Sequence, residues 1–481
     1  MNLADALDIH ARARPTHVAL IEGTRRVTYA EVARFVRDLA ARLVAVPDDA
    51  PVGVCLRDTA EHVLVLFALA RAGRAILPMD VRWTDAERQN VAAHFGASLV
   101  LLEPDMAPVA GLRCATVAEV SAWPAQDVAF SDDEAAPFVL SLSSGTTGRP
   151  KGPLIAHRHF LARFRTHWIN MGLNGRDRFL CATPLYFGGG RTFAMSVLFS
   201  GGTVVMCPPP ASPEAIIGAI AEHDITSLFL VPTQFRRLLA LSDDALAPMR
   251  RLHLLFSSGA PLSREERVQI AERLCANFFE YYASTEGGGV SLLGPGDIVE
   301  HGDSVGRPVF AVEVEVVDDD GRALPAGEAG LLRYRGPACA TAYHRDPEAS
   351  AEAFRDGWFY PGDLASVDAD GFVTLRGRRK DMIIRAGINI YPADVEAALN
   401  AHPAVGESAV VPWPSREFGE EIAAFVRLAT PADPEAVLEF VRARLPRPKW
   451  PRAVFVVEDL PRNSGGKVLK RELATRLTPI P

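Results

Sequence analysis

The sequence lacks the cysteine patterns that hold metal ions or form disulfide frameworks. Its six cysteines are spread singly over 481 residues, and no two have CxxC or zinc-ligand spacing. Single, scattered cysteines are typical of proteins in a reducing compartment. The cysteines therefore give no indication of a zinc site or a redox pair, and they favour a cytoplasmic location.

A secretory leader and a long apolar run are also missing. The N-terminal segment carries Asp5 and Asp8 where a secretory signal has an apolar core. The longest apolar stretch, around residues 63–77, is interrupted by Arg71 and Arg74, so we expect no segment that spans a bilayer. Together with the cysteines, these features predict a cytoplasmic protein without membrane insertion.

An excess of positive charge is absent as well. Lys and Arg number 51 against 59 Asp and Glu, which leaves a net charge of −8. Because nucleic-acid contact usually needs a concentrated basic surface, this balance argues against a nucleic-acid partner. The hydrophobic share of 48% and the charged share of 23% are instead typical of a globular protein.

The length and the order of apolar patterns indicate more than one domain. A chain of 481 residues exceeds the roughly 250–300 residues that one core supports. Helical spacing alternates with short apolar runs up to about residue 300, as in 29–44, 61–72, 138–142 and 228–231. This alternation predicts a fold of layered α/β sheets that are mainly parallel.

The last third of the chain has a different pattern. Residues 311–321 show the period of two and the turn signals of a strand, and about 300–379 is interpreted as a β-rich subregion. The rest of the chain mixes helical and strand patterns. We therefore predict a large α/β domain over 1–379 and a small, mobile α+β domain over 380–481, with the boundary in the charged turn at 376–382.

A loop rich in glycine and hydroxyl side chains, SSGTTGRPKG, occupies residues 143–152 directly after an apolar run. Its glycines permit close backbone approach, its hydroxyls can donate, and Lys151 adds a cation, which together suit a polyphosphate. The spacing differs from GxxxxGK[ST], and the alternative is a flexible surface loop of small residues. The candidate phosphate-binding residues are Ser143, Ser144, Gly145, Thr146, Thr147, Gly148 and Lys151.

This loop resembles the phosphate loop of the adenylate-forming (ANL) superfamily, which includes acyl-CoA synthetases. Further segments resemble that family's motifs, in the same order, over nearly the whole chain. They are VTYAE (27–31), ARAGRAILPMD (70–80), SSGAPL (257–262), YYASTEGG (281–288), WFYPGDL (358–364), GRRKDMIIRAGINIYP (377–392) and PRNSGGKV (461–468). The ordered set is specific, and it implies an acyl-CoA synthetase that uses ATP, Mg²⁺ and coenzyme A.

The resemblance implies a first reaction in which a carboxylate attacks the α-phosphate of ATP, giving an acyl adenylate and pyrophosphate. Glu286 is then the Mg²⁺ ligand, Thr285 hydrogen-bonds the α-phosphate, and Lys467 bridges the two reacting anions. Asp363 accepts the ribose hydroxyls and Arg378 contacts the nucleotide. Taken alone, these residues also fit a helix start, a surface lysine and turns. Further nucleotide-binding positions are Gly259, Ala260, Pro261, Tyr281, Tyr282, Ala283 and Ser284.

The resemblance also implies a second reaction, in which the acyl group moves to a thiol. The small domain is expected to rotate about Lys380, which withdraws Lys467 and presents the loop around Gly387 to the pantetheine arm. Lys449 is expected to contact the phosphates of CoA. Gly387 also fits a turn glycine, and Lys449, in a basic cluster with Arg447 and Arg452, fits an ordinary solvated loop equally well.

Residues 183–193, TPLYFGGGRTF, correspond to the segment that walls the acyl pocket in the family. The pocket residues are Tyr186, Phe187, Gly188, Gly189, Phe229 and Val231. Phe187 stands where many acyl-CoA synthetases carry His, and no Asp is visible here that would bind the ammonium group of an amino acid. An aromatic or medium-sized apolar acid is therefore favoured.

Two further positions need an interpretation. Arg191 is either a partner for a second carboxylate on the substrate or a structural arginine. Ala283 stands where the family commonly has Gly, and its methyl group is tolerable if φ is negative.

We therefore expect an AMP-forming acid–thiol ligase whose partners are a small carboxylic acid, ATP and CoA. A stand-alone enzyme that loads the acyl group onto the phosphopantetheine of an acyl carrier protein would use the same residues. The chain ends soon after Lys467 without a carrier domain, which favours CoA. A non-catalytic nucleotide-binding protein is disfavoured, because Glu286, Asp363 and Lys467 are all present.

Overall fold

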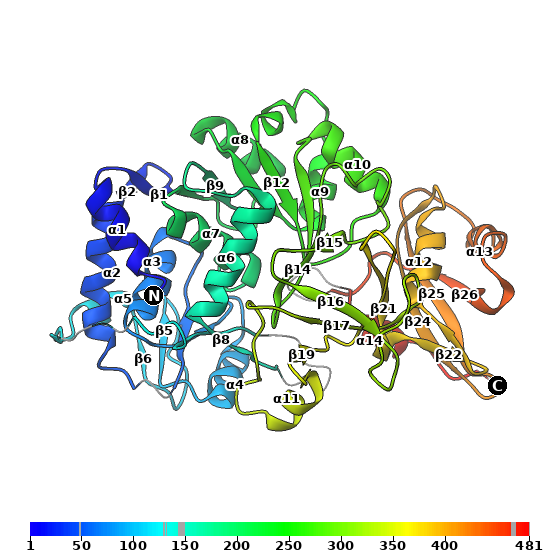
Figure 1. Cartoon of the computed structure of the whole chain (residues 1–481). Coiled ribbons are helices and arrows are strands. Elements are labelled where there is room, and N and C mark those ends of the chain that lie inside the picture. Colours follow the sequence, from blue (N-terminus) through cyan, green and yellow to red (C-terminus); the bar gives the residue numbers. More distant parts are fainter. Residues whose placement is uncertain (48–49, 128–129, 131, 143–149, 463–467, 481) are drawn as a thin grey trace. The chain divides into compact units, whose positions relative to one another are not determined.

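Figure 1 shows the computed structural model, which describes residues 1–47, 50–127, 130, 132–142, 150–462 and 468–480. The chain divides into two compact units. The first comprises Met1–Glu313 and Tyr334–Phe359, and the second comprises Val314–Arg333 and Tyr360–Pro481. Strand β17 (Gly330–Arg335) therefore contributes residues to both units.

The first unit contains a nine-stranded sheet with the strand order β15-β14-β13-β12-β11-β9-β10-β1-β2. Neighbouring strands from β13 to β1 run parallel, and antiparallel pairs stand at both ends. The bounds are β1 (Val18–Glu22), β2 (Arg25–Thr28), β9 (Arg178–Cys181), β10 (Thr203–Met206), β11 (Ser227–Leu230), β12 (Leu254–Ser257), β13 (Phe278–Ser284), β14 (Gly288–Leu293) and β15 (Arg307–Pro308). The parallel strands are buried almost throughout, as expected for a sheet covered on both faces.

A six-stranded sheet with the order β6-β5-β3-β4-β7-β8 completes the sheets of the first unit's N-terminal part. Its strands run parallel up to β7, and β8 is antiparallel to β7. The bounds are β3 (Val52–Cys55), β4 (Ile76–Pro78), β5 (Leu99–Leu102), β6 (Cys114–Ala115), β7 (Pro137–Leu140) and β8 (Leu154–Ala156). The predicted phosphate loop thus falls in the chain between two neighbouring strands of this sheet.

Helices α3 and α6 lie between the two sheets (Figure 1), because each contacts strands of both. Every residue of α3 except Glu61 is buried, as the apolar residues on all its faces require. The helices are α1 (Asp5–Ala13), α2 (Tyr29–Leu43), α3 (Ala60–Arg71), α4 (Asp85–Phe95), α5 (Val117–Ser121), α6 (His157–Met171), α7 (Gly188–Ser200), α8 (Pro213–His223), α9 (Pro232–Leu239), η1 (Ala247–Arg251) and α10 (Arg264–Arg273). The later segment of this unit adds α11 (Pro347–Ala353), β18 (Phe354–Arg355) and β19 (Trp358–Phe359).

The second unit carries its own strands and helices. β16 (Glu313–Val317) pairs with β17, β17 with β20 (Asp363–Val367), and β20 with β21 (Val373–Arg378). A further sheet has the order β23-β22-β25-β24, and β26 pairs with β25. Its elements are β22 (Ile383–Arg385), β23 (Ile388–Ile390), β24 (Val405–Ser415), β25 (Gly419–Leu428), β26 (Ala453–Val456), α12 (Pro392–Asn400), α13 (Pro434–Arg442), α14 (Lys470–Ala474), η2 (Arg379–Asp381) and η3 (Arg447–Lys449).

The sheet of β24 and β25 is apolar on both faces. Val410 and Ile422 belong to a buried cluster with Val395 of α12, whereas Val411 belongs to another cluster with Leu473 of α14. Alternate residues of a strand point to opposite faces, so a continuous apolar run covers both clusters. The helices of this unit therefore flank one central sheet.

The predicted α/β class with mainly parallel sheets is confirmed, and so is the mixed character of the last part of the chain. The charged turn predicted at 376–382 needs a correction. β21 continues to Arg378, whose partner in the register is Asp363, and only Arg379–Asp381 form a 3₁₀ turn. The predicted boundary after residue 379 marks the position of a proposed hinge. This boundary stays a prediction.

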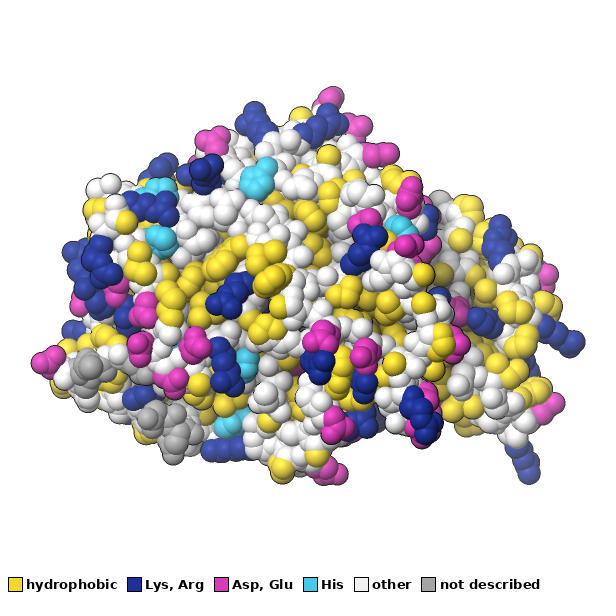
Figure 2. Space-filling view, viewed as in Figure 1, with side chains coloured by type: hydrophobic (Ala, Val, Ile, Leu, Met, Phe, Trp, Pro, Cys, Tyr) yellow, Lys and Arg dark blue, Asp and Glu magenta, His cyan; other side chains and the backbone are white. Residues whose placement is uncertain are grey.

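No helix in the described part of the chain is long and apolar enough to cross a membrane. On the face seen in Figure 2, basic and acidic side chains are intermixed. Hydrophobic side chains gather there over α6, where Ile169 is 56% exposed. This face offers mixed charge around an apolar area and shows no continuous basic field.

Candidate active site

The Thr-Glu pair of the predicted nucleotide site lies in the turn between β13 and β14. The register of these antiparallel strands shifts between Tyr282 and Ala283, which marks a bulge beside the turn. Thr285 is half-buried and Glu286 is buried. The pair therefore connects two strands and does not start a helix. Ala283 lies in the extended strand without a positive φ, so its methyl group is tolerated as expected.

Arg163 of α6 holds this turn through backbone carbonyls. Its Nη2 donates to the carbonyl oxygens of Thr285 at 3.0 Å, Glu286 at 3.3 Å and Ala338 at 3.4 Å. Arg163 is buried, and burial lowers the pKa of its guanidinium. A buried cation with three carbonyl acceptors orients the main chain of the turn.

Two glycines that follow Glu286 make room for aromatic side chains. A Cβ on Gly287 would collide with the ring of Tyr334, and a Cβ on Gly289 would collide with the hydroxyl of Tyr281. Ser284 Oγ lies 2.5 Å from the Tyr334 hydroxyl and accepts the N–H of Gly287 over 2.8 Å. Gly287 of the YYASTEGG segment and Gly289 just after it are therefore required by packing next to the turn.

Tyr343 connects the Glu286 carboxylate with the end of the predicted phosphate loop. Its hydroxyl donates to Glu286 Oε1 over 3.0 Å, and the Lys151 ammonium lies 5.2 Å from the centre of its ring. The N–H of His344 donates to the Gly152 carbonyl over 2.8 Å. Burial and then the Glu286 carboxylate raise the pKa of Tyr343, so its phenol keeps the proton that it donates.

The glycines at the start of α7 bring aromatic rings of the predicted acyl pocket together. Phe187 is the half-buried N-cap residue of α7. A Cβ on Gly189 would lie 2.6 Å from the Phe229 ring and 3.3 Å from the Phe187 ring. One on Gly259, in the predicted adenine loop after β12, would lie 4.0 Å from Phe187. Phe187 thus lies near both Gly189 of the predicted acyl pocket and Gly259 of the predicted adenine loop.

The other predicted pocket residues lie on neighbouring elements. Phe229 of β11 is buried and packs with its ring tilted against those of Phe193 and Phe256 in the core. Val231 is the N-cap residue of α9, while Gly188 is exposed at the start of α7. Phe229 is therefore a core side chain that would support the predicted wall from inside.

Arg191 holds the backbone of the segment before α7. Its Nη1 donates to the carbonyls of Leu185 and Tyr186, both at 3.0 Å, and its Nη2 donates to Ser141 Oγ at 3.1 Å. The side chain is 1% exposed, and burial lowers its pKa to about 9. These contacts support the interpretation of Arg191 as a structural arginine.

Asp58 fixes the same segment from another side. The Leu185 N–H donates to Asp58 Oδ1 over 2.6 Å. Burial raises the pKa of Asp58 to about 6; the Leu185 N–H opposes the rise, the Asp80 carboxylate adds to it, and Arg82 opposes it. The Asp80 carboxylate in turn accepts from Arg82, which also donates to the Tyr186 hydroxyl at 2.8 Å.

We expect Asp58→Asn to stabilise the fold at neutral pH. Because the pKa of Asp58 lies above its ordinary value of 3.8, the folded state binds this proton more tightly than the unfolded state. The free energy of unfolding of the parent should therefore fall as the pH rises from about 4 to about 6. Asparagine does not titrate but still accepts the Leu185 N–H, so it should remove this fall.

Chemical denaturation of the parent and of Asp58→Asn across this pH range measures the free energy of unfolding of each. The matched control is Asp127→Asn, which changes an exposed residue. A stability difference between Asp58→Asn and the parent that does not vary with pH would contradict the prediction.

In the second unit, the predicted ribose ligand is adjacent to Arg378. Asp363 begins β20 and Arg378 ends β21, and the two face each other in the register. Arg378 Nε lies 3.1 Å from Asp363 Oδ1, and Asp363 is buried. The ion pair orients the carboxylate. Lys380, the predicted hinge, is exposed in η2.

The predicted CoA contacts also lie in the second unit. Ala386 (φ 49°) and Gly387 (φ 81°) form the two-residue turn of the β22–β23 hairpin, which matches the turn-glycine interpretation. Lys449 Nζ pairs with Asp394 Oδ2 at 2.5 Å. A role of Gly387 toward pantetheine and of Lys449 toward a phosphate stays a prediction.

Several predicted residues lie outside the described part of the chain. They are Ser143, Ser144, Gly145, Thr146, Thr147, Gly148 and Lys467. Their assigned roles rest on the sequence and stay predictions. Lys151 and Gly152, at the end of the loop, are described and contact the segment of Tyr343.

Sequence reasoning missed Tyr343, Arg163 and Asp58. The helical pattern contained a signal for Arg163. Its spacing places it on one face with Phe160 and His167, where a buried arginine needs hydrogen-bond acceptors. Tyr343 and Asp58 have no local signal, since their partners are far away in the chain. Only the tertiary structure identifies them.

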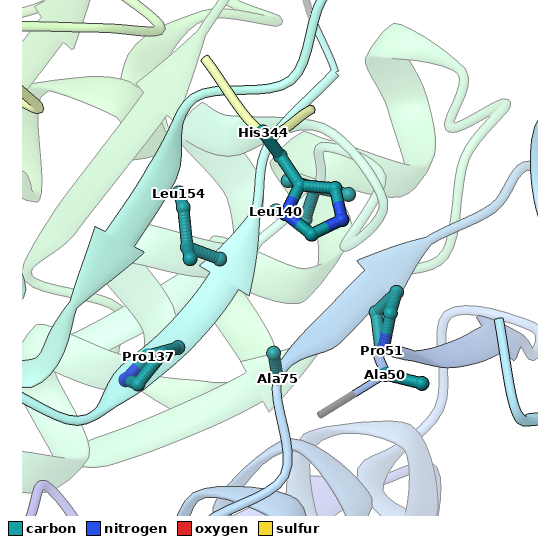
Figure 3. A pocket seen from close by; sticks show the side chains of 7 residues that line it. All are labelled: Ala50, Pro51, Ala75, Pro137, Leu140, Leu154 and His344. Carbon is teal, nitrogen blue, oxygen red and sulfur yellow. The ribbon is translucent and has the colours of Figure 1, made fainter. Parts of the chain in front are cut away.

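A pocket of about 50 Å³ lies beside the six-stranded sheet (Figure 3). Figure 3 shows its lining by Ala50, Pro51, Ala75, Pro137, Leu140, Leu154 and His344. Pockets for small-molecule ligands usually measure about 300–1,000 Å³. This pocket is therefore too small for a nucleotide or an acyl group.

The donor set around Glu286 fits Mg²⁺. Among the described residues, no group of three or more His, Cys, Asp or Glu could hold a metal ion. Mg²⁺ usually takes one or two carboxylates, and phosphate oxygens and water complete its shell. The buried Glu286 carboxylate, with Oε1 bonded to Tyr343, has the chemistry of such a ligand, and its assignment to Mg²⁺ stays a prediction.

Comparisons with known proteins identify relatives that align over nearly the whole chain. A feruloyl-CoA synthase from Amycolatopsis sp is 33% identical over 482 residues, covering 97% of each chain. A fatty acid–[acyl-carrier-protein] ligase from Streptomyces coeruleorubidus is 31% identical, covering 98% of this chain and 96% of the relative. The solved O-succinylbenzoate coenzyme A synthetase from Bacillus subtilis, in complex with ATP and magnesium ion, has a TM-score of 0.88 and 27% identity, covering 97% of this chain and 98% of that one.

Family models match both parts of the chain. The model described as AMP-binding enzyme matches residues 7–344, and that of the AMP-binding enzyme C-terminal domain matches residues 394–467. These ranges include most of the motifs found in the sequence, in the same order. The chain therefore belongs to the AMP-binding enzyme family, the adenylate-forming superfamily that its motifs resemble.

Proposed function

We propose that this AMP-forming acid–thiol ligase activates an aromatic or medium-sized apolar carboxylic acid with ATP and passes the acyl group to coenzyme A. The observation that carries the proposal is the meeting of Lys151 and Glu286 at Tyr343, at the end of the phosphate loop. An apolar carboxylate that reacts with a polyphosphate needs such a charged cluster together with an apolar wall. Phe187 and the glycines at the start of α7 provide the wall in the same unit.

In the first half-reaction, a substrate carboxylate oxygen attacks the α-phosphorus and pyrophosphate leaves. Two anions meet, so the site has to neutralise charge rather than supply a base. Bound Mg²⁺ supplies part of that neutralisation at the phosphate oxygens. The carboxylate of Glu286 would bind Mg²⁺. Thr285 donates to the α-phosphate, and Lys467 places its ammonium between the reacting groups. Asp363 binds the ribose hydroxyls, with Arg378 beside it.

In the second half-reaction, the thiol of CoA attacks the acyl carbon and AMP leaves. The proposal includes a hinge at Lys380 and a mobile small domain over residues 380–481, which withdraws Lys467 after the first step. Gly387, in an exposed hairpin turn, leaves space for the pantetheine arm, and Lys449 assists the CoA phosphates. A cytoplasmic location, where ATP and CoA are available, belongs to the same proposal.

Similarity to the feruloyl-CoA synthase supports the aromatic substrate class. Phe187 and Val231 are partly buried and apolar, and Gly188 contributes no side chain. Because Arg191 donates to backbone carbonyls and Ser141, a dicarboxylic substrate has no support from that residue. The acyl pocket therefore recognises its substrate by apolar and aromatic contact.

Pyrophosphate release across aromatic, aliphatic, dicarboxylic and amino acids tests the proposal, with product masses recorded in the presence of CoA. We expect release with aromatic and medium-sized apolar acids, and acyl-CoA as the product. Release confined to dicarboxylic or amino acids would overturn the substrate class. Normal pyrophosphate release without any CoA thioester would overturn the acceptor.

A second candidate acceptor is the phosphopantetheine arm of an acyl carrier protein. The similarity to a fatty acid–[acyl-carrier-protein] ligase favours it. Both acceptors use the first half-reaction and the same residues. Replacing CoA with holo acyl carrier protein in the assay distinguishes them, because only the preferred thiol should accelerate AMP release.

A further inference from the structure

We propose that Tyr343 is a positioning residue that holds the Glu286 carboxylate in one orientation and ties it to the end of the phosphate loop. This inference rests on the proposed function, because it concerns the carboxylate assigned to Mg²⁺. Its test measures nucleotide binding, so that it does not depend on the identity of the acid.

The hydrogen bond between the two side chains is buried. Tyr343 and Glu286 are each 8% exposed, and the hydroxyl donates to Oε1 over 3.0 Å. Hydrogen bonds to a carboxylate in a buried setting are strong and directional. Because Oε1 is held by this bond, the direction in which Oε2 points is fixed as well.

The backbone of Tyr343 is anchored on the segment that follows the phosphate loop. Tyr343 forms an antiparallel bridge with Pro153, and the next residue donates its N–H to the Gly152 carbonyl at 2.8 Å. The Tyr343 N–H itself donates to Ser350 Oγ at 2.9 Å. The Lys151 ammonium lies 5.2 Å from the centre of the Tyr343 ring. One side chain therefore contacts both the cation of the loop and the acidic residue of the β13–β14 turn.

The main chain of Glu286 has separate restraints. Its carbonyl accepts from Arg163 Nη2 at 3.3 Å and from the Ala340 N–H at 2.9 Å. Removing the Tyr343 hydroxyl should therefore free the carboxylate to rotate while the turn keeps its place. Loss of such an outer partner of a metal ligand typically lowers metal affinity about 10–100-fold.

The test is Tyr343→Phe, which keeps the ring beside Lys151 and removes only the hydroxyl. ATP binding is measured by calorimetry over a range of Mg²⁺ concentrations and again in EDTA. We expect the Mg²⁺ concentration for half-maximal enhancement of ATP binding to rise about 10–100-fold, with unchanged ATP affinity in EDTA. The control Tyr29→Phe removes a buried hydroxyl that donates to the Leu198 and Gly202 carbonyls, and it should leave the Mg²⁺ requirement unchanged.

A second variant replaces Tyr343 with 4-aminophenylalanine, whose N–H can still donate, and it should restore the Mg²⁺ requirement of the parent. An unchanged requirement in Tyr343→Phe, or an equal loss of ATP affinity with and without Mg²⁺, would overturn the proposal. If Tyr343→Phe does not fold, the 4-aminophenylalanine variant tests the inference by itself. A Mg²⁺ requirement above that of the parent in this variant would contradict the inference. A parent protein that binds no Mg²⁺–ATP would instead overturn the proposed function.

Discussion

Replacing Lys467 with alanine is expected to lower the rate of adenylate formation by on the order of 10²–10³-fold. The ammonium of Lys467 is assigned to the space between two anions, and its loss leaves the charge that develops at the α-phosphate without a counter-charge. Lys467 stands in the PRNSGGKV segment and lies outside the described residues, so this prediction rests on the sequence. Single-turnover formation of the acyl adenylate measures the effect.

The control for this variant is Lys470→Ala, which removes a nearby lysine on α14. Lys470 Nζ pairs with Glu396 Oε1 at 2.6 Å, so its role is to stabilise the second unit. Lys470→Ala should keep the adenylation rate near that of the parent. Lys467→Ala should still bind ATP, and an unchanged adenylation rate in it would refute the assigned role.

Glu286→Gln is expected to reduce pyrophosphate release by roughly 10²–10³-fold, the size typical of losing an electrostatic group at a developing charge. Glutamine has nearly the same shape and can still accept the Tyr343 hydroxyl, but it lacks the negative charge that a hard cation needs. The rate should also depend more weakly on Mg²⁺. Initial rates over a range of Mg²⁺ at saturating ATP and acid measure both effects.

Glu286→Asp and Glu300→Gln complete this experiment. Glu286→Asp keeps the charge on a shorter side chain and should retain more activity than Glu286→Gln. Glu300 is exposed in the same unit, and its neutralisation should leave the Mg²⁺ dependence unchanged. If Glu286→Gln had the rate and Mg²⁺ dependence of the parent, Glu286 would not be the metal-binding carboxylate.

The local patterns of the sequence predicted much of the first unit. The helical pattern at 29–44 lies at α2, which starts at the capping box of Thr28 and Glu31, and the apolar run at 228–231 lies at β11. Such elements are readable because their periodicity and caps are local. The sheet order was not readable, since it depends on pairing between distant strands.

One strand of the second unit shows what local patterns do not reveal. β24 contains Pro412 and Pro414, and proline weakens the indication of a strand because it cannot donate to a ladder. In the structure β24 stands at the edge of its sheet and pairs along one side with β25. An edge strand tolerates proline, and only the tertiary arrangement reveals that position.

By itself, the sequence determined which chemical groups the protein carries and in which order, because SSGTTGRPKG, YYASTEGG and PRNSGGKV are contiguous segments. Only the tertiary structure decided what restrains those groups. Tyr343 reaches Glu286 and the end of the phosphate loop, Arg163 holds the turn, and Arg191 belongs to the backbone before α7. These contacts join segments that are remote in the chain, and a hydrogen bond between remote residues leaves no periodicity in the sequence.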